Sequence, residues 1–176
     1  YFDGITWNQT DQIYGARDLW GTGPNNVYAI EEHYREGNKH VMHFDGSTWT
    51  SIGDFSSSPH RLQGLETGAV VAVGYGGLCQ MYDGTNWTDL ETGDNGNYYS
   101  TWGSSLDNLY VGSYESGSIL HFNGDSWKKI RMGRSGYAWL ILGDSPNNLF
   151  VFLGSNGLMH FDGTDWNADL YDGLYV

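Results

Sequence analysis

The sequence is poor in several features that define common protein classes. It has one cysteine, Cys79, so it forms no internal disulfide and no cysteine-based zinc site. It has three prolines, and no apolar run approaches the roughly 18 residues that cross a bilayer. Eight Lys and Arg stand against 21 Asp and Glu, a formal net charge of -13. This balance argues against nucleic acid or an anionic membrane as the partner.

Aromatic residues and glycine are abundant instead. Aromatics make up 16% of the 176 residues, and there are 26 glycines. Rings favour strands and glycine favours tight turns, so the composition is typical of an all-β protein. The hydrophobic content of 39% and the mean hydropathy of -0.47 fit one globular domain with a buried core.

A short motif recurs along the whole chain. It consists of an aromatic residue, Asp or Asn, Gly, two further residues and Trp, and its copies lie about 40 residues apart. The five copies end at Trp7, Trp49, Trp87, Trp127 and Trp166. A second motif, containing Asn-Asn or Asp-Asn before an apolar run, starts at Trp20, Trp102 and Leu142, with a degenerate copy near Gly64. Two motifs in fixed phase indicate a repeat protein.

Each repeat predicts four short strands. In the first complete unit we expect strands at 13–20, 27–32, 40–45 and 48–52, with turns at Asn25-Asn26 and Asp45-Gly46. Four antiparallel strands in such a repeat predict a β-propeller blade. The predicted units of this single propeller domain are 1–10 (partial), 11–53, 54–91, 92–131, 132–170 and 171–176 (partial).

These motifs resemble known propeller repeats. The hairpin motif resembles a shortened Asp-box turn of sialidase-type propellers, and Gly76-Gly77 with Tyr82, Asp83 and Trp87 resembles a kelch blade. The segment from Trp20 to Ile30 resembles repeats of large secreted bacterial propeller proteins. The resemblance covers nearly the whole chain and implies a bacterial protein that is extracellular or at the cell surface. It carries no activity, because propellers host many functions.

The strands amount to about four complete blades plus parts of a fifth. Because an open propeller exposes edge strands, three arrangements remain open. The chain is a fragment of a longer propeller, or two copies close a ring in trans, or one copy closes alone through residues 1–10 and 172–176.

The acidic and histidine positions of the repeat suggest metals, but structural roles are favoured. Asp45, Asp83 and Asp162, with Asn123 in the fourth copy, are expected to shape their turns while the Trp residues fill the blade core. Calcium needs six to eight converging oxygens, which repeats related by rotation do not supply. The same argument applies to zinc at His43, His121 and His160. We therefore expect no metal and no cofactor.

The loops that differ between repeats are the candidate binding face. These are the loops between the second and third strands of a blade and between successive blades. They hold Tyr, Arg, Asn and Glu, a composition suited to glycan or protein recognition. The candidate contact residues are Tyr34, Arg35, Tyr75, Asn95, Tyr98, Tyr114, Glu115, Arg131, Arg134 and Tyr137.

The favoured function is therefore a non-catalytic binding module for a glycan or a protein. One alternative is an assembly unit of a larger surface complex or filament, which uses open edge strands as contacts. A less favoured alternative is a sialidase-like hydrolase with its site in the central channel. That alternative requires Arg35, Arg131 and Arg134 to converge with a tyrosine and a carboxylate.

Overall fold

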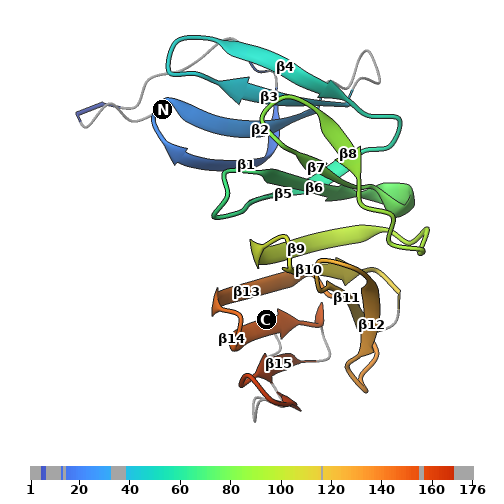
Figure 1. The fold of residues 1–176 in the computed structure, drawn as a ribbon. Coiled ribbons are helices and arrows are strands. Elements are labelled where there is room, and N and C mark those ends of the chain that lie inside the picture. Colours follow the sequence, from blue (N-terminus) through green and yellow to red (C-terminus); the bar gives the residue numbers. More distant parts are fainter. Residues whose placement is uncertain are drawn as a thin grey trace. The chain divides into compact units, whose positions relative to one another are not determined.

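The computed structural model describes residues 5–6, 13, 15–32, 39–115, 117–154 and 157–168, and these are almost entirely β-structure. The chain divides into two compact units, residues 1–56 and 57–176, which are described separately. The described residues contain sixteen strands and one 3-10 helix, and Figure 1 draws them as a ribbon. The partial units expected at residues 1–10 and 171–176 lie almost wholly outside the described residues.

Unit 1 contains one four-stranded antiparallel sheet in the order β1-β2-β3-β4. Its strands are β1 (Ala16–Gly23), β2 (Asn26–Glu32), β3 (Lys39–Phe44) and β4 (Trp49–Asp54). The four predicted strands are confirmed, with shifted ends. β1 continues past Trp20 because Gly21 pairs with Val27 and Gly23 with Asn26. β4 continues to Asp54 because that residue pairs with His40.

Unit 2 contains three sheets of the same kind, each with its strands in sequence order. The first has β5 (Pro59–Gly64), β6 (Val70–Gly74), the 3-10 helix η1 (Tyr75–Gly77), β7 (Cys79–Tyr82) and β8 (Trp87–Asp89). The second has β9 (Tyr98–Ser105), β10 (Asn108–Ser113), β11 (Ser118–Phe122) and β12 (Trp127–Arg131). The third has β13 (Leu140–Ser145), β14 (Asn148–Phe152), β15 (Leu158–Phe161) and β16 (Trp166–Ala168).

The core of unit 2 lies between neighbouring sheets. β9 contacts both β5 and β13, so the first strands of the three sheets lie side by side (Figure 1). One apolar cluster joins the first two sheets through Val71, Val73 and Cys79 on one side and Leu109 and Val111 on the other. A second cluster joins the last two sheets through Tyr110, Ile119, Ile141, Leu149 and Val151. Burial raises the pKa of the Cys79 thiol to about 12, so the thiol stays protonated within this cluster.

The third-to-fourth-strand turns repeat almost without change, and their acidic residues shape the backbone. Asp83 Oδ1 accepts hydrogen bonds from the N–H groups of Thr85 and Asn86, both at 2.7 Å. Asp45, Asn123 and Asp162 accept the corresponding pairs in their turns. These backbone bonds lower the pKa values of Asp45, Asp83 and Asp162. The predicted turn-shaping role is thus present in all four described copies.

The repeated tryptophans lie at the edge of the blade core, and Trp127 and Trp166 pack against the two apolar clusters of unit 2. Each described Trp is half-buried and lies against the aromatic residue of its own hairpin, with ring centroids 5.0–5.2 Å apart. Aliphatic side chains of the second strands supply much of the fully buried core beside them. The tryptophan comes three residues after the turn glycine, which places it at the blade margin. Trp7 lies outside the described residues.

The three repeated histidines join the ends of each blade's central strands. His121 Nε2 hydrogen-bonds Asn108 Oδ1 at 2.9 Å, and its ring stacks on Tyr110 with centroids 4.2 Å apart. His43 and His160 make the same bond to Asn26 and Asn148, and they lie against Tyr28 and Phe150. The β5–β8 sheet has Met81 at this position and Ala69 at the asparagine position. The histidine and its asparagine partner are therefore absent together.

Candidate binding surface

In unit 2, the variable loops lie at the end of each sheet opposite the acidic turns, and backbone hydrogen bonds tie them together. Gly77 N–H donates to the carbonyl of Gly96 at 2.7 Å, which links η1 to the loop before β9. Tyr114 N–H donates to the carbonyl of Asn97 at 2.8 Å. The next pair of loops is joined where Met132 N–H donates to the Gly117 carbonyl, also at 2.8 Å. The loops thus form one connected surface.

Six aromatic side chains on this surface contact one another in a continuous series. We call this set the aromatic surface; its members are His60, Tyr75, Tyr99, Tyr114, Tyr137 and Trp139. The Tyr99 ring lies at its centre, with centroids 4.6 Å from His60 and 5.1 Å from Trp139. Tyr75 stands edge-on to Tyr99 at 5.8 Å, and Tyr114 lies 5.4 Å from Tyr99 on another side. His60 and Tyr99 lie on β5 and β9, and the other four rings lie in η1, the loop after β10 and the loop before β13.

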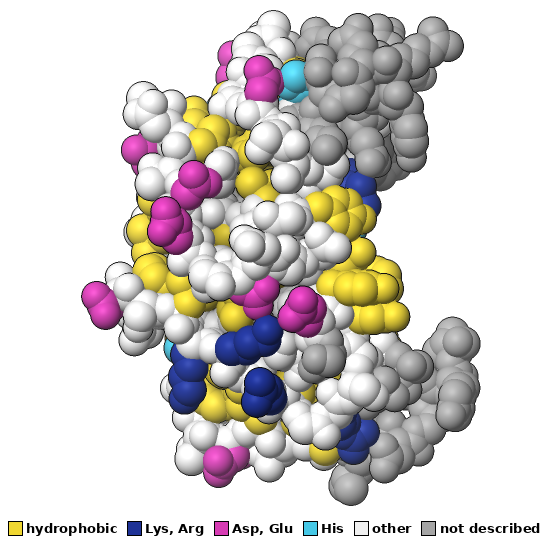
Figure 2. All heavy atoms as spheres, turned by 90° about the vertical axis from the view of Figure 1, so that its right-hand side faces the viewer, with side chains coloured by type: hydrophobic (Ala, Val, Ile, Leu, Met, Phe, Trp, Pro, Cys, Tyr) yellow, Lys and Arg dark blue, Asp and Glu magenta, His cyan; other side chains and the backbone are white. Residues whose placement is uncertain are grey.

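The outer part of the aromatic surface is open to solvent. Tyr114 and Tyr137 stack in parallel with centroids 4.2 Å apart, and Trp139 stands edge-on to Tyr137 at 5.9 Å. All three side chains are exposed. A hydrogen bond between the two hydroxyls raises the pKa of Tyr114. Figure 2 looks onto this face, where hydrophobic side chains gather beside acidic and basic ones. Three exposed rings held by their neighbours provide contact area with little ordering cost.

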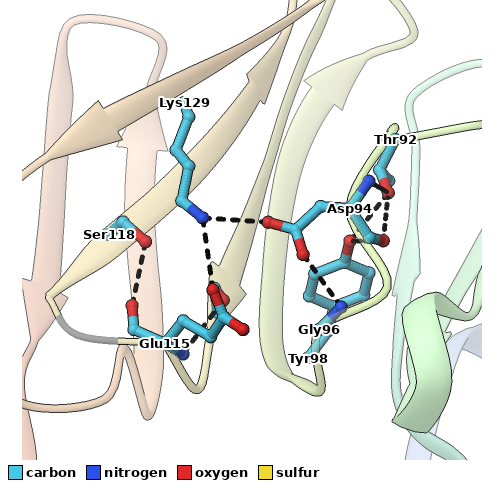
Figure 3. A network of polar contacts seen from close by, with 8 residues as sticks. Thr92, Asp94, Gly96, Tyr98, Glu115, Ser118 and Lys129 are labelled. Carbon is cyan, nitrogen blue, oxygen red and sulfur yellow. Dashed lines mark hydrogen bonds and ion pairs between the residues drawn. The ribbon is translucent and has the colours of Figure 1, made fainter.

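Charged groups lie beside the rings. Lys129 Nζ on β12 donates to Asp94 Oδ2 at 3.0 Å and lies 3.5 Å from Glu115 Oε2. The bond raises the pKa of Lys129 and lowers that of Asp94. Figure 3 shows how one lysine joins the loop before β9 to the loop after β10. The carboxylates of Asp94 and Glu115 thus share one ammonium group.

Glycine permits the close approach of these loops at one position above all. Gly117 has φ +58°, and a Cβ atom there would lie 1.6 Å from the carbonyl oxygen of Arg134. Only glycine fits both the left-handed backbone and the missing space. Gly117 therefore fixes the loop that carries Tyr114 and Glu115 against the loop that carries Tyr137.

The structure brings together several of the predicted contact residues. Tyr75, Tyr114 and Tyr137 belong to the aromatic surface, and Glu115 forms part of its charged edge. Asn95 is exposed in the loop that packs against Gly77. Arg131 is exposed at the end of β12, and Arg134 is half-buried, near Gly117 and Gly157. Tyr34 and Arg35 lie outside the described residues.

The prediction for Tyr98 is wrong. Its side chain is fully buried in the core between the first two sheets, and burial raises its pKa to about 12. Its hydroxyl donates to the carbonyl of Asp94 at 2.8 Å and hydrogen-bonds Thr92 Oγ1 at 2.7 Å. The register shifts where Ser113 pairs with Tyr98 and Gly112 pairs with Ser100. This irregularity turns Tyr98 inward, and Tyr99 lies at the surface instead.

Sequence reasoning missed His60, Tyr99 and Trp139. A signal for them was present, because each precedes the same position of its repeat by three residues. Those positions are Gln63, Trp102 and Leu142. Three rings in one phase, each at or just before the first strand of its blade, indicate a shared surface rather than scattered loops.

Within the described ranges, no three His, Cys, Asp or Glu side chains come together as metal ligands. In those same ranges no helix has the length and apolar character to span a membrane. The hydrolase alternative stays a prediction, since Arg35 is outside the described residues.

Comparison with known proteins gives the fold. The chain matches no family model and no curated protein. It is similar to a structure of YCF48 bound to D1 peptide, with 18% identity and a TM-score of 0.69 over 95% of this chain and 59% of that one. YCF48 from Cyanidioschyzon merolae has 11% identity and a TM-score of 0.62, over 86% of this chain and 55% of the other. The chain thus spans less than two thirds of either YCF48 chain.

A designed protein is similar over almost its full length. The computationally designed Ika4 protein has 11% identity and a TM-score of 0.60, over 88% of this chain and 99% of Ika4. Together with the four-stranded antiparallel sheets, these likenesses define an all-β partial β-propeller and confirm the predicted fold class. The finer resemblance to kelch and Asp-box repeats stays a prediction.

Proposed function

We propose that this chain is a protein-binding module that holds a peptide segment of its partner across the aromatic surface. The observation that carries the proposal is the continuous series of six rings, contributed by β5, β9, η1 and the loops of unit 2. Surfaces where aromatic anchors cluster supply most of the binding energy in protein interfaces.

The composition of the surface supports a peptide ligand. Tyr114, Tyr137 and Trp139 are exposed and pack against each other, so they lose little side-chain freedom on binding. Glu115 and Asp94 beside them favour a partner segment that carries a basic residue near its apolar anchor. YCF48, a propeller that this chain resembles in fold, has been solved bound to a D1 peptide. That likeness supports peptide binding as a use of this scaffold.

Glycan binding is the second candidate. Exposed Trp139 offers an indole face, and the exposed Asn95 and Glu115 offer an amide and a carboxylate on neighbouring loops. Sugar rings pack on such aromatic faces while polar groups fix their orientation. An extracellular or cell-surface location in a bacterium, predicted from the repeat resemblance, suits either ligand and stays a prediction.

The experiment selects peptides from a random 12-residue display library on the immobilised chain and measures the best binders by calorimetry. Trp139→Ala and Tyr114→Ala are each expected to weaken binding at least about 30-fold, because they remove aromatic anchors. Trp87→Ala is the matched control, since it removes a half-buried tryptophan from the opposite end of a blade.

The same proteins are applied to a glycan array. Peptide binding that depends on Trp139 while the array stays blank supports the proposal. Glycan binding lost in Trp139→Ala would replace it with the second candidate. Selected peptides that bind Trp139→Ala and Tyr114→Ala as tightly as the unaltered chain would overturn it.

A further inference from the structure

Each sheet of unit 2 has two faces, and neighbouring sheets pack face to face. We call the face toward the following blade its front face and the opposite face its rear face. The front face of β9–β12 packs against the rear face of β13–β16. Trp102 Nε1 donates to the Gly143 carbonyl at 2.9 Å across this interface, and Ser100 Oγ donates to the Ala138 carbonyl at 2.8 Å. The repeat thus defines how one blade covers the next.

The front face of β13–β16 is apolar and exposed. Leu142 occupies the repeat position of Trp102 and is 54% exposed. Phe152 and its strand partner Leu140 are 44% and 40% exposed. On β9–β12 the front-face residue Tyr110 is only 4% exposed. The same kind of face is therefore buried in one blade and open in the other.

The rear face of β1–β4 in unit 1 shows the complementary feature. Leu19 occupies the repeat position of Ile141, yet it is 58% exposed where Ile141 is 2% exposed. Val27 and Met42 are half-buried, whereas their equivalents Leu149 and Met159 are buried in the interface. This rear face offers the same apolar chemistry as the one already covered in unit 2.

Gly143 and Gly21 occupy the same repeat position on the two rear faces. A Cβ atom on Gly143 would lie 2.8 Å from the Trp102 ring, so glycine there lets the front-face side chain approach the backbone. Gly21 stands at the same repeat position, two residues after Leu19. A Cβ atom on Gly21 would lie 2.7 Å from the carbonyl oxygen of Asn26 in its own sheet, so glycine is required there before any facing blade is considered.

We propose that the front face of β13–β16 is a docking surface for a second copy of this chain, which presents the rear face of its β1–β4 sheet. The contact is heterologous: Leu142, Phe152 and Leu140 of one copy cover Leu19 and its neighbours on the other. Two such contacts, made reciprocally, give a closed dimer. The interface continues the blade-to-blade packing already present between β9–β12 and β13–β16, and it uses none of the six rings of the aromatic surface.

The test uses cysteine pairs in the 176-residue chain. Leu19→Cys and Leu142→Cys are purified separately, mixed, and treated with a short bis-maleimide. Cys79 stays in place because it is buried and its thiol is protonated. A heterologous contact gives cross-linked dimers in the mixture, while either variant alone gives no more than the unaltered chain. The double variant, treated at high dilution, reports closure within one chain.

Association is measured beside the cross-linking by sedimentation equilibrium. Leu142→Glu and Leu19→Glu are expected to convert a dimer to a monomer, whereas Thr88→Glu, on the exposed side of an outer strand, leaves the dimer unchanged. Protection of Cys79 from a thiol reagent shows that each variant is folded. A chain that is monomeric at high micromolar concentration would overturn the proposal, as would intramolecular cross-linking of the double variant. Equal cross-linking of Leu142→Cys with itself would do the same, because it indicates front-to-front contact.

Discussion

The two ends of the blades in unit 2 differ: the turns at one end repeat, and the loops at the other end vary. At the end with the third-to-fourth-strand turns, every described blade uses the same carboxylate or amide to accept two backbone N–H bonds. At the other end, no two loops have the same sequence, yet their side chains form one aromatic surface. At the first end, the repeated side chain satisfies the backbone N–H groups of its own blade. Variation at the second end creates a surface that no single blade has.

The difference shows where binding residues are found in this fold. Side chains that repeat, such as Asp83 and His121, have partners within their own blade. Rings of the aromatic surface instead meet partners from neighbouring blades and loops, as Tyr99 meets His60 and Trp139. A rigid frame with identical turns therefore supports loops whose sequences are free to serve a ligand.

The largest expected effect on stability is at Gly117, where two of the variable loops approach each other closely. Gly117→Ala places a methyl group against the Arg134 carbonyl and forces alanine into a left-handed backbone. We expect a loss of about 3 kcal/mol or more in the free energy of unfolding. Urea denaturation followed by fluorescence measures it. Gly133→Ala is the control, since it has φ +69° but open space around its Cβ, and it should cost about 1 kcal/mol.

An equal loss in both glycine variants would contradict this account. It would mean that backbone conformation alone, and not the approach of the two loops, requires glycine at position 117.

The next largest effect on stability is expected at His121, which belongs to the repeated end of the blade. His121→Ala removes the stack on Tyr110 and leaves Asn108 Oδ1 without its ring partner. We expect a loss of about 1 to 2 kcal/mol in the free energy of unfolding. Peptide binding should be unchanged, because His121 lies away from the aromatic surface. If His121→Ala weakened peptide binding and left the free energy of unfolding unchanged, the separation of a structural end from a binding end would be wrong.

The same histidine gives a pH dependence with a defined sign. Burial, with a smaller contribution from Lys128, lowers the pKa of His121 in the folded state. Its neutral ring therefore stabilises the fold above the unfolded pKa, and this stability is lost as pH falls below it toward the folded value. Thermal melts across pH 5 to 8 should show a shallower decline below about pH 6.5 in His121→Gln than in the unaltered chain.

Sequence reasoning identified the repeated end well and the variable end only in part. Asp83 and His121 recur in phase, and each makes its bonds inside one blade, so a local pattern was sufficient to assign their roles. Tyr98 and Tyr99 are adjacent and alike, and only a register shift opposite Ser113 decides which is buried. Such a shift depends on packing between blades, which no local pattern contains. Trp139 is a different case, because it shares its repeat phase with Tyr99 and the sequence therefore contains the signal for it.

A smaller effect is expected from the acidic turns, where substitution separates charge from geometry. Asp83→Asn keeps an oxygen that accepts the two backbone bonds, as Asn123 does in the next blade, so the melting temperature at pH 7 should change little. Asp83→Ala removes the acceptor and should lower it. Those backbone bonds lower the folded pKa of Asp83, so its stabilisation is present above the unfolded pKa of about 3.9 and is lost as pH falls through the folded value. Melts between pH 2 and 5 should therefore decline less in Asp83→Asn, and an identical decline would show that the carboxylate charge is irrelevant to the turn.

The smallest effect on stability is expected at the exposed rings. This prediction separates the role of the variable end from that of the repeated end most clearly. Tyr137→Ala and Trp139→Ala each remove ring contacts at the surface while leaving both apolar clusters of unit 2 complete. We expect the free energy of unfolding to change by about 0.5 kcal/mol or less, as for most surface substitutions. Loss of peptide binding at unchanged stability would show that these rings are kept for a ligand. A loss of several kcal/mol would instead make the aromatic surface part of the packing between blades, and the two ends would then serve the same purpose.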